Sequence, residues 1–185
     1  MTPAPAIHQD SPRGFHVVLV EPEIPPNTGN VARLCAATRT TLHLIEPFGF
    51  RLDNAALKRA GMDYWKHVEW RRWPDWQAFR QAQSSAARFW FIESHGPRLY
   101  TEVAYAPDDY LVFGRETAGL PHSLLNAHED TWLRLPMFNP AARSLNLSNC
   151  VAVVLFEALR QHGFGRECGV RAAAPRQAHG RKTTV

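Results

Sequence analysis

Short β-branched or aromatic runs alternate with helix patterns between residues 15 and 162 of this 185-residue chain. This alternation is typical of a parallel sheet covered by helices, since parallel strands need crossover connections that helices usually supply. The predicted strands cover residues 16–21, 42–46, 67–70, 88–93, 110–114 and 131–135. We therefore expect a single α/β domain whose functional residues lie on loops at the carboxyl ends of the strands.

Helix patterns fall between these strands. They predict helices from about Thr28 to Thr38, from Asn54 to Arg59, from Pro74 onward, from Pro121 onward, and from Leu147 to His162. The last helix has an apolar stripe wider than one face, which predicts packing on two sides and is compatible with a second subunit.

Composition narrows the function classes. No apolar run approaches the roughly 18–20 residues that span a bilayer, so we expect no membrane segment. Cys35, Cys150 and Cys168 are odd in number and widely spaced, which argues against disulfides and thiolate metal sites. The nine histidines show no metal-binding spacing. We expect a metal-free protein of the reducing cytoplasm.

Three regions are expected along the chain: a flexible leader at 1–14, a folded domain at 15–163, and a basic tail at 164–185. The leader lacks the basic start and apolar run of a secretion signal. Residues 163–185 carry five basic groups and one acidic group, which accounts for the net charge of +4. Such a tail could contact a polyanion or could simply solubilise the terminus.

The first unusual loop, residues 20–34, follows a strand and precedes a helix but has one glycine where a phosphate cradle has three. Asn27 or Thr28 could cap the helix, and Arg33 projects from its first or second turn. A helix start with an arginine suits an anion such as a phosphodiester. The alternative is an ordinary capped helix with Arg33 solvated, which spacing alone slightly favours.

The second loop, residues 113–121, begins where a strand ends at Gly114, a residue that allows a ligand to approach the backbone closely. Glu116 could bind an arginine, accept a hydrogen bond from a ribose hydroxyl, or lie near a helix start. By itself the pattern is weak evidence, and an ordinary loop remains the alternative.

The third loop, residues 136–149, leads into the long apolar helix. It offers four side chains that suit helix capping and ligand binding equally well: Ser144, Asn146, Ser148 and Asn149. Backbone amides at this helix start could bind a small molecule, while leucines and valines supply an apolar wall.

Aromatic and basic residues also interleave at 64–76. They could stack on RNA bases, but burial of the tryptophans in the core is the favoured interpretation.

The residues and order of these loops resemble the SPOUT methyltransferases, within them the small subgroup that methylates the wobble-position ribose of tRNA. Four matching stretches carry the resemblance, which runs from about Phe15 to Gly163: residues 21–33, 60–64, 113–121 and 143–149. The chain departs from the subgroup at Phe156, where tyrosine is frequent, at Arg115, where proline is usual, and at Ala118, where a basic residue is frequent. The last two changes could keep a positive charge near the substrate.

The resemblance implies a Rossmann-like sheet whose carboxyl-terminal segment is threaded into a deep trefoil knot. It implies that S-adenosylmethionine binds in the knot, in contact with Ile92, Gly114, Leu135 and Ser144. It also implies a catalytic set of Asn27, Arg33, Glu116 and Asn146, of which Asn27 and Arg33 face the ribose and its phosphate across from the methyl donor.

The implied activity is 2′-O-methylation of the wobble cytidine or modified uridine in the tRNA anticodon stem-loop, by a homodimer that contacts through the last helix. Two alternatives stay open: the same chemistry on ribosomal RNA, and a catalytically silent RNA-binding dimer with this fold.

Overall fold

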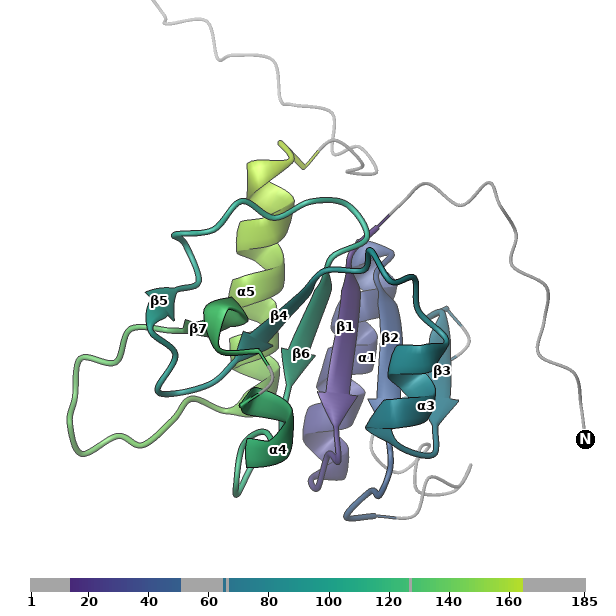
Figure 1. Cartoon of the computed structure of the whole chain (residues 1–185), viewed down its shortest axis with the longest axis horizontal. Helices are drawn as coiled ribbons and strands as arrows, with labels where there is room; N and C mark the ends of the chain where they lie inside the picture. The colour runs from purple at the N-terminus through teal and green to yellow at the C-terminus, as the bar shows by residue number, and fades with distance from the viewer. Residues whose placement is uncertain (1–13, 51–64, 66, 127, 165–185) are drawn as a thin grey trace, which may run out of the picture.

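The computed structural model describes residues 14–50, 65, 67–126 and 128–164. Its seven strands form one sheet in the order β3-β2-β1-β6-β4-β7-β5, and every pair of neighbours is parallel. Figure 1 shows this twisted sheet with helices on both faces. The strands are β1 (His16–Val20), β2 (Thr41–Ile45), β3 (Trp70–Trp73), β4 (Phe89–Ile92), β5 (Arg98–Leu99), β6 (Tyr110–Phe113) and β7 (Trp132–Arg134).

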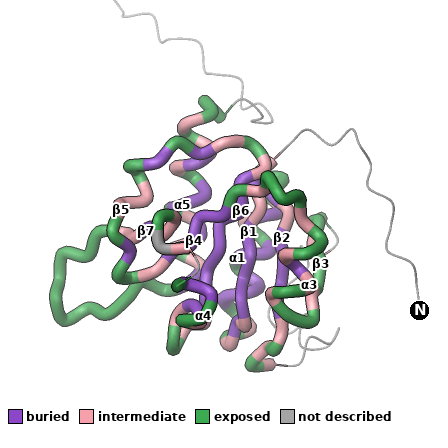
Figure 2. Tube along the Cα trace, viewed as in Figure 1, coloured by how far each residue is buried: buried purple, intermediate pink, exposed green. Residues whose placement is uncertain are grey.

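Helices α1 (Pro25–Thr38) and α5 (Leu147–Gln161) cover one face of the sheet, whereas α3 (Trp76–Gln81) and α4 (His122–Leu125) cover the other (Figure 1). A short 3₁₀ helix, η2 (Glu129–Thr131), precedes β7. The central strands β1, β4 and β6 are buried on both faces, as strands of a covered parallel sheet must be (Figure 2).

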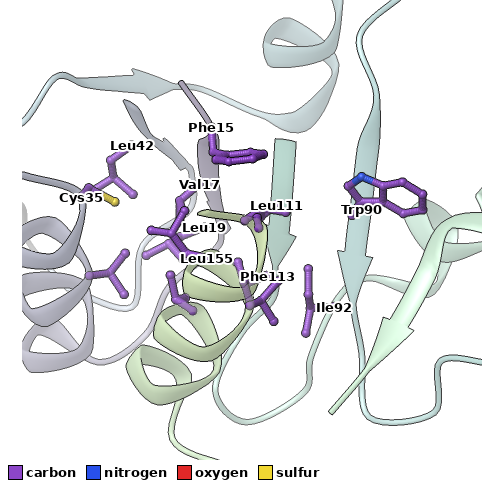
Figure 3. Packing of buried hydrophobic residues seen from close by; sticks show 14 of the residues in the cluster. Phe15, Val17, Leu19, Cys35, Leu42, Trp90, Ile92, Leu111, Phe113 and Leu155 are labelled. Atoms are coloured by element: carbon purple, nitrogen blue, oxygen red, sulfur yellow. The ribbon is translucent and has the colours of Figure 1, made fainter. Parts of the chain in front are cut away.

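Each face of the sheet has its own apolar core. Under α1 and α5, Figure 3 shows Leu155 of the last helix among Leu19 and Phe113 of the strands. On the other face, Phe79 of α3 is fully buried against Phe89 and Tyr110. The two cores hold the carboxyl ends of the strands in fixed register, so the loops that leave those ends start from fixed positions.

Five of the six predicted strands are confirmed to within one residue at each end. The sixth, predicted at 67–70, is wrong in position. It lies at Trp70–Trp73, because pairing with Leu42 through Ile45 sets its register. Its two middle residues, Arg71 and Arg72, are exposed at the sheet edge, so the apolar signal that marks the other strands is missing here. The two-residue strand β5 was not predicted from the sequence.

Helix α1 begins at Pro25 rather than Thr28, so the predicted caps at Asn27 and Thr28 are wrong. Two prolines occupy the first turn, where a missing N–H costs nothing. Helix α3 begins at Trp76, after Asp75, whose side chain accepts a hydrogen bond from Ala78 N at 2.7 Å. Helices α4 and α5 are confirmed near their predicted starts.

The tryptophans of the aromatic stretch are half-buried and pack against the cores, which supports the burial interpretation: Trp65, Trp70, Trp73 and Trp76. The helix predicted at 54–59, the leader and nearly all of the tail lie outside the described residues. The trefoil knot stays a prediction. Among the described residues, no helix is long and apolar enough to cross a membrane.

Candidate active site

A pocket of about 300 Å³ lies at the carboxyl ends of the central strands. Its wall comes from residues that follow β1, β4, β6 and β7 and from the start of α5. The apolar part of the wall includes Ile92, Phe113, Leu135 and Leu147, and the polar part includes Asn27, Glu116 and Asn146. Loops from four strand ends therefore converge on one concave site, as is typical of ligand sites in open α/β sheets.

A chain of hydrogen bonds joins the three loops across the pocket. Asn27 Nδ2 donates to Glu116 Oε1 at 3.0 Å, and Asn146 Nδ2 donates to Asn27 Oδ1 at 2.8 Å. Asn146 Oδ1 then accepts from Ser148 N at 2.9 Å, so Asn146 also caps α5. Asn27 is only 5% exposed, and its amide is oriented by a partner on each side.

Glu116 supplies the cap that α1 lacks in its own sequence. Its carboxylate accepts from the backbone N–H of Glu23 at 2.9 Å and of Ile24 at 3.3 Å, in addition to Asn27. A carboxylate at a helix amino terminus is stabilised by the N–H groups and dipole there. Of its three predicted roles, the structure places Glu116 in the one beside the helix start.

A second carboxylate, that of Glu23 in the first loop, accepts hydrogen bonds from the second loop. Thr117 donates to Glu23 from its backbone N at 3.0 Å and from its hydroxyl at 2.8 Å. These hydrogen bonds lower the pKa of the Glu23 carboxyl. Since Glu23 and Glu116 each reach into the other's loop, residues 21–27 and 114–119 are held as one unit.

Gly114 is required by the protein itself. A Cβ at this position would lie 2.2 Å from the backbone carbon of Gly119 and 2.3 Å from Leu120 N. The close approach arises because Arg115 and Gly119 exchange two backbone hydrogen bonds of 3.0 Å each. Gly119 has a φ of +66°, in the left-handed region that favours glycine. The turn beside the pocket is therefore tight and of fixed shape.

The structure brings nearly all predicted site residues together. Every one of them lines the pocket except Arg33: Asn27, Ile92, Gly114, Glu116, Leu135, Ser144 and Asn146. Arg33 is exposed on α1, one to two turns beyond Asn27, and is not among the lining residues.

Several lining residues were missed by sequence reasoning, among them Glu93, Met137 and Cys150, whereas Arg115 was noted as a possible positive charge near the substrate. Glu93 directly follows β4, so its place at a carboxyl strand end was a signal that could have found it. Its carboxylate accepts from Ser94 N at 2.8 Å and Leu120 N at 3.1 Å. Burial raises the pKa of the Cys150 thiol, so this side chain is an uncharged part of the wall.

The fold and the pocket define an open α/β protein with a concave site at the carboxyl ends of its parallel sheet. The chain belongs to the SpoU rRNA methylase family, whose model matches residues 14–156. This confirms the family expected from the loop motifs.

Similar proteins agree with this assignment. A tRNA (cytidine(34)-2′-O)-methyltransferase of Burkholderia ambifaria is 53% identical over 152 residues, which cover 81% of this chain and 97% of the relative. A structure solved to study the 2-OH methylation of C/U34 on tRNA is 43% identical with a TM-score of 0.77, covering 84% of this chain and 94% of that one. An AdoMet-bound rRNA methyltransferase from Sinorhizobium meliloti is 25% identical with a TM-score of 0.70, covering 80% of this chain and 56% of that one.

Proposed function

We propose that this protein is an S-adenosylmethionine-dependent methyltransferase that methylates the 2′-oxygen of the wobble ribose, cytidine or modified uridine, in tRNA. One observation carries the proposal. The first and third motifs, far apart in sequence, meet around one pocket through the Asn27–Asn146 hydrogen bond, in a chain whose relatives with this activity match over most of its length.

The chemistry of the pocket fits S-adenosylmethionine. Apolar side chains at Ile92, Leu135 and Leu147 can face the adenine ring, and the Glu93 and Glu116 carboxylates suit a ligand that carries cationic groups. Ile92, Gly114, Leu135 and Ser144 would hold the cofactor. When bound, S-adenosylmethionine supplies an electrophilic methyl group on a sulfonium.

The residues of this chain contribute position rather than a strong base. Asn27 and Asn146 are locked in one orientation by Glu116 and Ser148, and they form the polar side of the pocket. Holding two reactants in line supplies much of the rate enhancement in group transfer. An asparagine amide has two N–H donors, so Asn27 retains one after its bond to Glu116.

Arg33 is proposed to bind a phosphate next to the methylated ribose. A guanidinium stays protonated at ordinary pH, so it cannot serve as the general base, but its planar fork matches a phosphodiester. Its exposed position on α1, outside the pocket, suits a contact with RNA rather than with the cofactor. The substrate is proposed to be the anticodon stem-loop.

A homodimer is part of the proposal. The outer face of α5 exposes Val153 and Phe156, which are 39% and 48% accessible, and Phe164 continues this apolar strip beyond the helix. Phe156 and Phe164 lie with ring centroids 6.5 Å apart. An apolar strip on the longest helix is an expected contact with a second copy.

Mass spectrometry of tRNA nucleosides tests the substrate. Cells that lack the gene should lose the 2′-O-methyl group from wobble cytidine or uridine nucleosides, and the gene should restore it. If ribosomal RNA loses a ribose methyl group instead, the ribosomal alternative replaces this proposal. If neither RNA changes, the protein is not an RNA methyltransferase.

The role of Arg33 is tested with purified protein. If charge alone matters, Arg33→Lys should retain appreciable turnover, whereas Arg33→Ala should lose most of it. Loss in both variants, with unchanged circular dichroism, indicates that the planar fork is needed.

A further inference from the structure

Among the described residues that line the pocket, Arg115 is the one cation, and the other charged side chains are Glu93 and Glu116. We infer that Arg115 binds an anionic oxygen of a ligand in this pocket, either the carboxylate of the cofactor or a phosphate of the RNA. The inference rests on the proposed function and extends it to a residue outside the predicted site.

The backbone of Arg115 is fixed by a tight turn. Arg115 N donates to Gly119 O and Gly119 N donates to Arg115 O, both at 3.0 Å, so the Cα has a defined position. The side chain extends from this turn and is 36% exposed. The partly exposed guanidinium is therefore held at a defined place on the pocket wall.

The guanidinium is poorly satisfied by the described part of the protein. Its Nη1 lies 3.5 Å from Glu21 Oε2, longer than the roughly 2.7–2.9 Å of a good charge-assisted hydrogen bond. Its Nε is buried and makes no hydrogen bond within the described residues. A guanidinium has five N–H donors, and a buried donor without a partner is rare enough to require an explanation.

The carboxylates of Glu93 and Glu116 do not serve as hydrogen-bond acceptors for the Arg115 guanidinium. Glu116 is occupied by three donors at the start of α1, and Glu93 by the backbone N–H groups of Ser94 and Leu120. Both carboxylates are therefore already engaged, and beyond its long contact with Glu21 the guanidinium can take a further anion from a ligand. A carboxylate and a phosphodiester each offer two oxygens that match the guanidinium fork.

Calorimetry and RNA binding test the inference with Arg115→Gln in the full chain. The small-molecule probes are S-adenosylhomocysteine, which has the carboxylate, and 5′-methylthioadenosine, which lacks it. The RNA probe is tRNA, titrated at several salt concentrations. Glu21→Gln is the matched control, because it removes the partner of Arg115 but keeps the cation.

If Arg115 binds the cofactor carboxylate, Arg115→Gln weakens S-adenosylhomocysteine by about tenfold or more and leaves 5′-methylthioadenosine unchanged. If it binds an RNA phosphate, both small molecules bind normally, tRNA binds more weakly, and the salt slope falls by about one. Glu21→Gln should bind every probe as well as the wild type, or more tightly.

Two results overturn the inference. One is an Arg115→Gln protein that binds all three probes like the wild type. The other is a Glu21→Gln protein that is weakened as much as Arg115→Gln, because the ion pair would then be structural. Arg115→Met repeats the test if the glutamine variant does not fold, since it also removes the cation, and unchanged binding again overturns the inference. A wild type that binds neither S-adenosylhomocysteine nor tRNA contradicts the proposed function itself.

Discussion

Asn27 and Asn146 are hydrogen-bonded at 2.8 Å although 119 residues separate them in the sequence. The direction of this hydrogen bond is set by Glu116. An ionised Glu116 can only accept, so Asn27 must present its NH₂ group to it and its oxygen to Asn146. Asn146 must then turn its own oxygen toward Ser148. One carboxylate thus orients two amides and the start of α5.

The donor-to-acceptor direction of the hydrogen bond between Asn27 and Glu116 can be tested by reversing it. Asn27→Asp places a second carboxylate beside Glu116, so we expect about 2–3 kcal/mol less stability and about a hundredfold lower kcat/KM. The double variant Asn27→Asp with Glu116→Gln restores a donor facing an acceptor. Chemical denaturation should therefore recover most of the stability, and a double variant that is less stable than either single one would contradict the assigned direction.

Gly114→Ala should destabilise the chain by about 2 kcal/mol or more, because its Cβ meets backbone atoms that cannot move independently. The binding of S-adenosylhomocysteine should weaken as the turn opens. Gly163→Ala is the control: Gly163, unlike Gly114, has a positive φ, of 65°, and open space around its missing Cβ. It should cost only about 1 kcal/mol.

Asp109 is 1% exposed and binds Arg88, Trp90 Nε1 and Ala106 N, with the Trp90 and Ala106 contacts both at 2.8 Å. Asp109→Asn leaves this cluster without its charge, and thermal unfolding should show a loss of about 3 kcal/mol. Asp109 precedes β6, at the opposite end from the pocket, so the folded variant should keep its activity. The control Arg72→Gln removes the exposed pair with Glu46 and should cost less than about 1 kcal/mol.

Stability should fall with acid because half-buried His16 pairs with buried His43. His16 Nδ1 lies 3.0 Å from His43 Nε2, and Trp73 Nε1 donates to His43 Nδ1 at 3.1 Å. Burial lowers the pKa of His16 to about 4 and that of His43 well below its usual value. Nearby Asp108 and Glu69 oppose the shift of His16, and Arg71 adds to it.

The sign follows from proton binding. Between about pH 6.5 and 4 the unfolded chain binds more protons than the folded chain. The contribution of His16 to the unfolding free energy is therefore fully present above pH 6.5 and is lost as the pH falls toward 4. The His16 shift corresponds to roughly 3 kcal/mol. Urea unfolding from pH 7 to 4.5 should show this slope. His43→Gln should flatten the slope, and the exposed-site variant His67→Gln should keep it.

The proposed homodimer predicts that Phe156→Glu produces monomers. A charge in the middle of the apolar strip of α5 must be desolvated when the strip is buried. Sedimentation at micromolar concentration should show a dimer for the wild type and a monomer for the variant. Gln77→Glu, on α3 at the other face of the sheet, should remain dimeric. A monomeric wild type would remove the dimer from the proposal.

Burial explains which parts of the fold were predictable from the sequence. Strands β1, β4 and β6 were predicted because burial on both faces requires continuous apolar runs. Strand β3 was misplaced because its edge position allows Arg71 and Arg72 to face solvent. Its place depends on pairing with β2, which no local pattern encodes.

The site was predictable as a set of residues but not as a set of contacts. The motifs identified Asn27, Glu116 and Asn146, yet nothing in their spacing indicates that Glu116 caps a helix 92 residues earlier in the chain. Long-range hydrogen bonds of this kind depend on how the loops pack. For the same reason, the contacts of Arg115, unlike its place near the substrate, became visible only in the folded chain.

The bond between Asn27 and Asn146 also bears on how the protein is made. A chain emerging from the ribosome presents β1 and the start of α1 early, but the opposite wall of the pocket is synthesised near the end. Until the segment around Leu147 has left the exit tunnel, the early asparagine has no partner there and the site does not exist. A chain that stops before this point lacks that wall of the pocket.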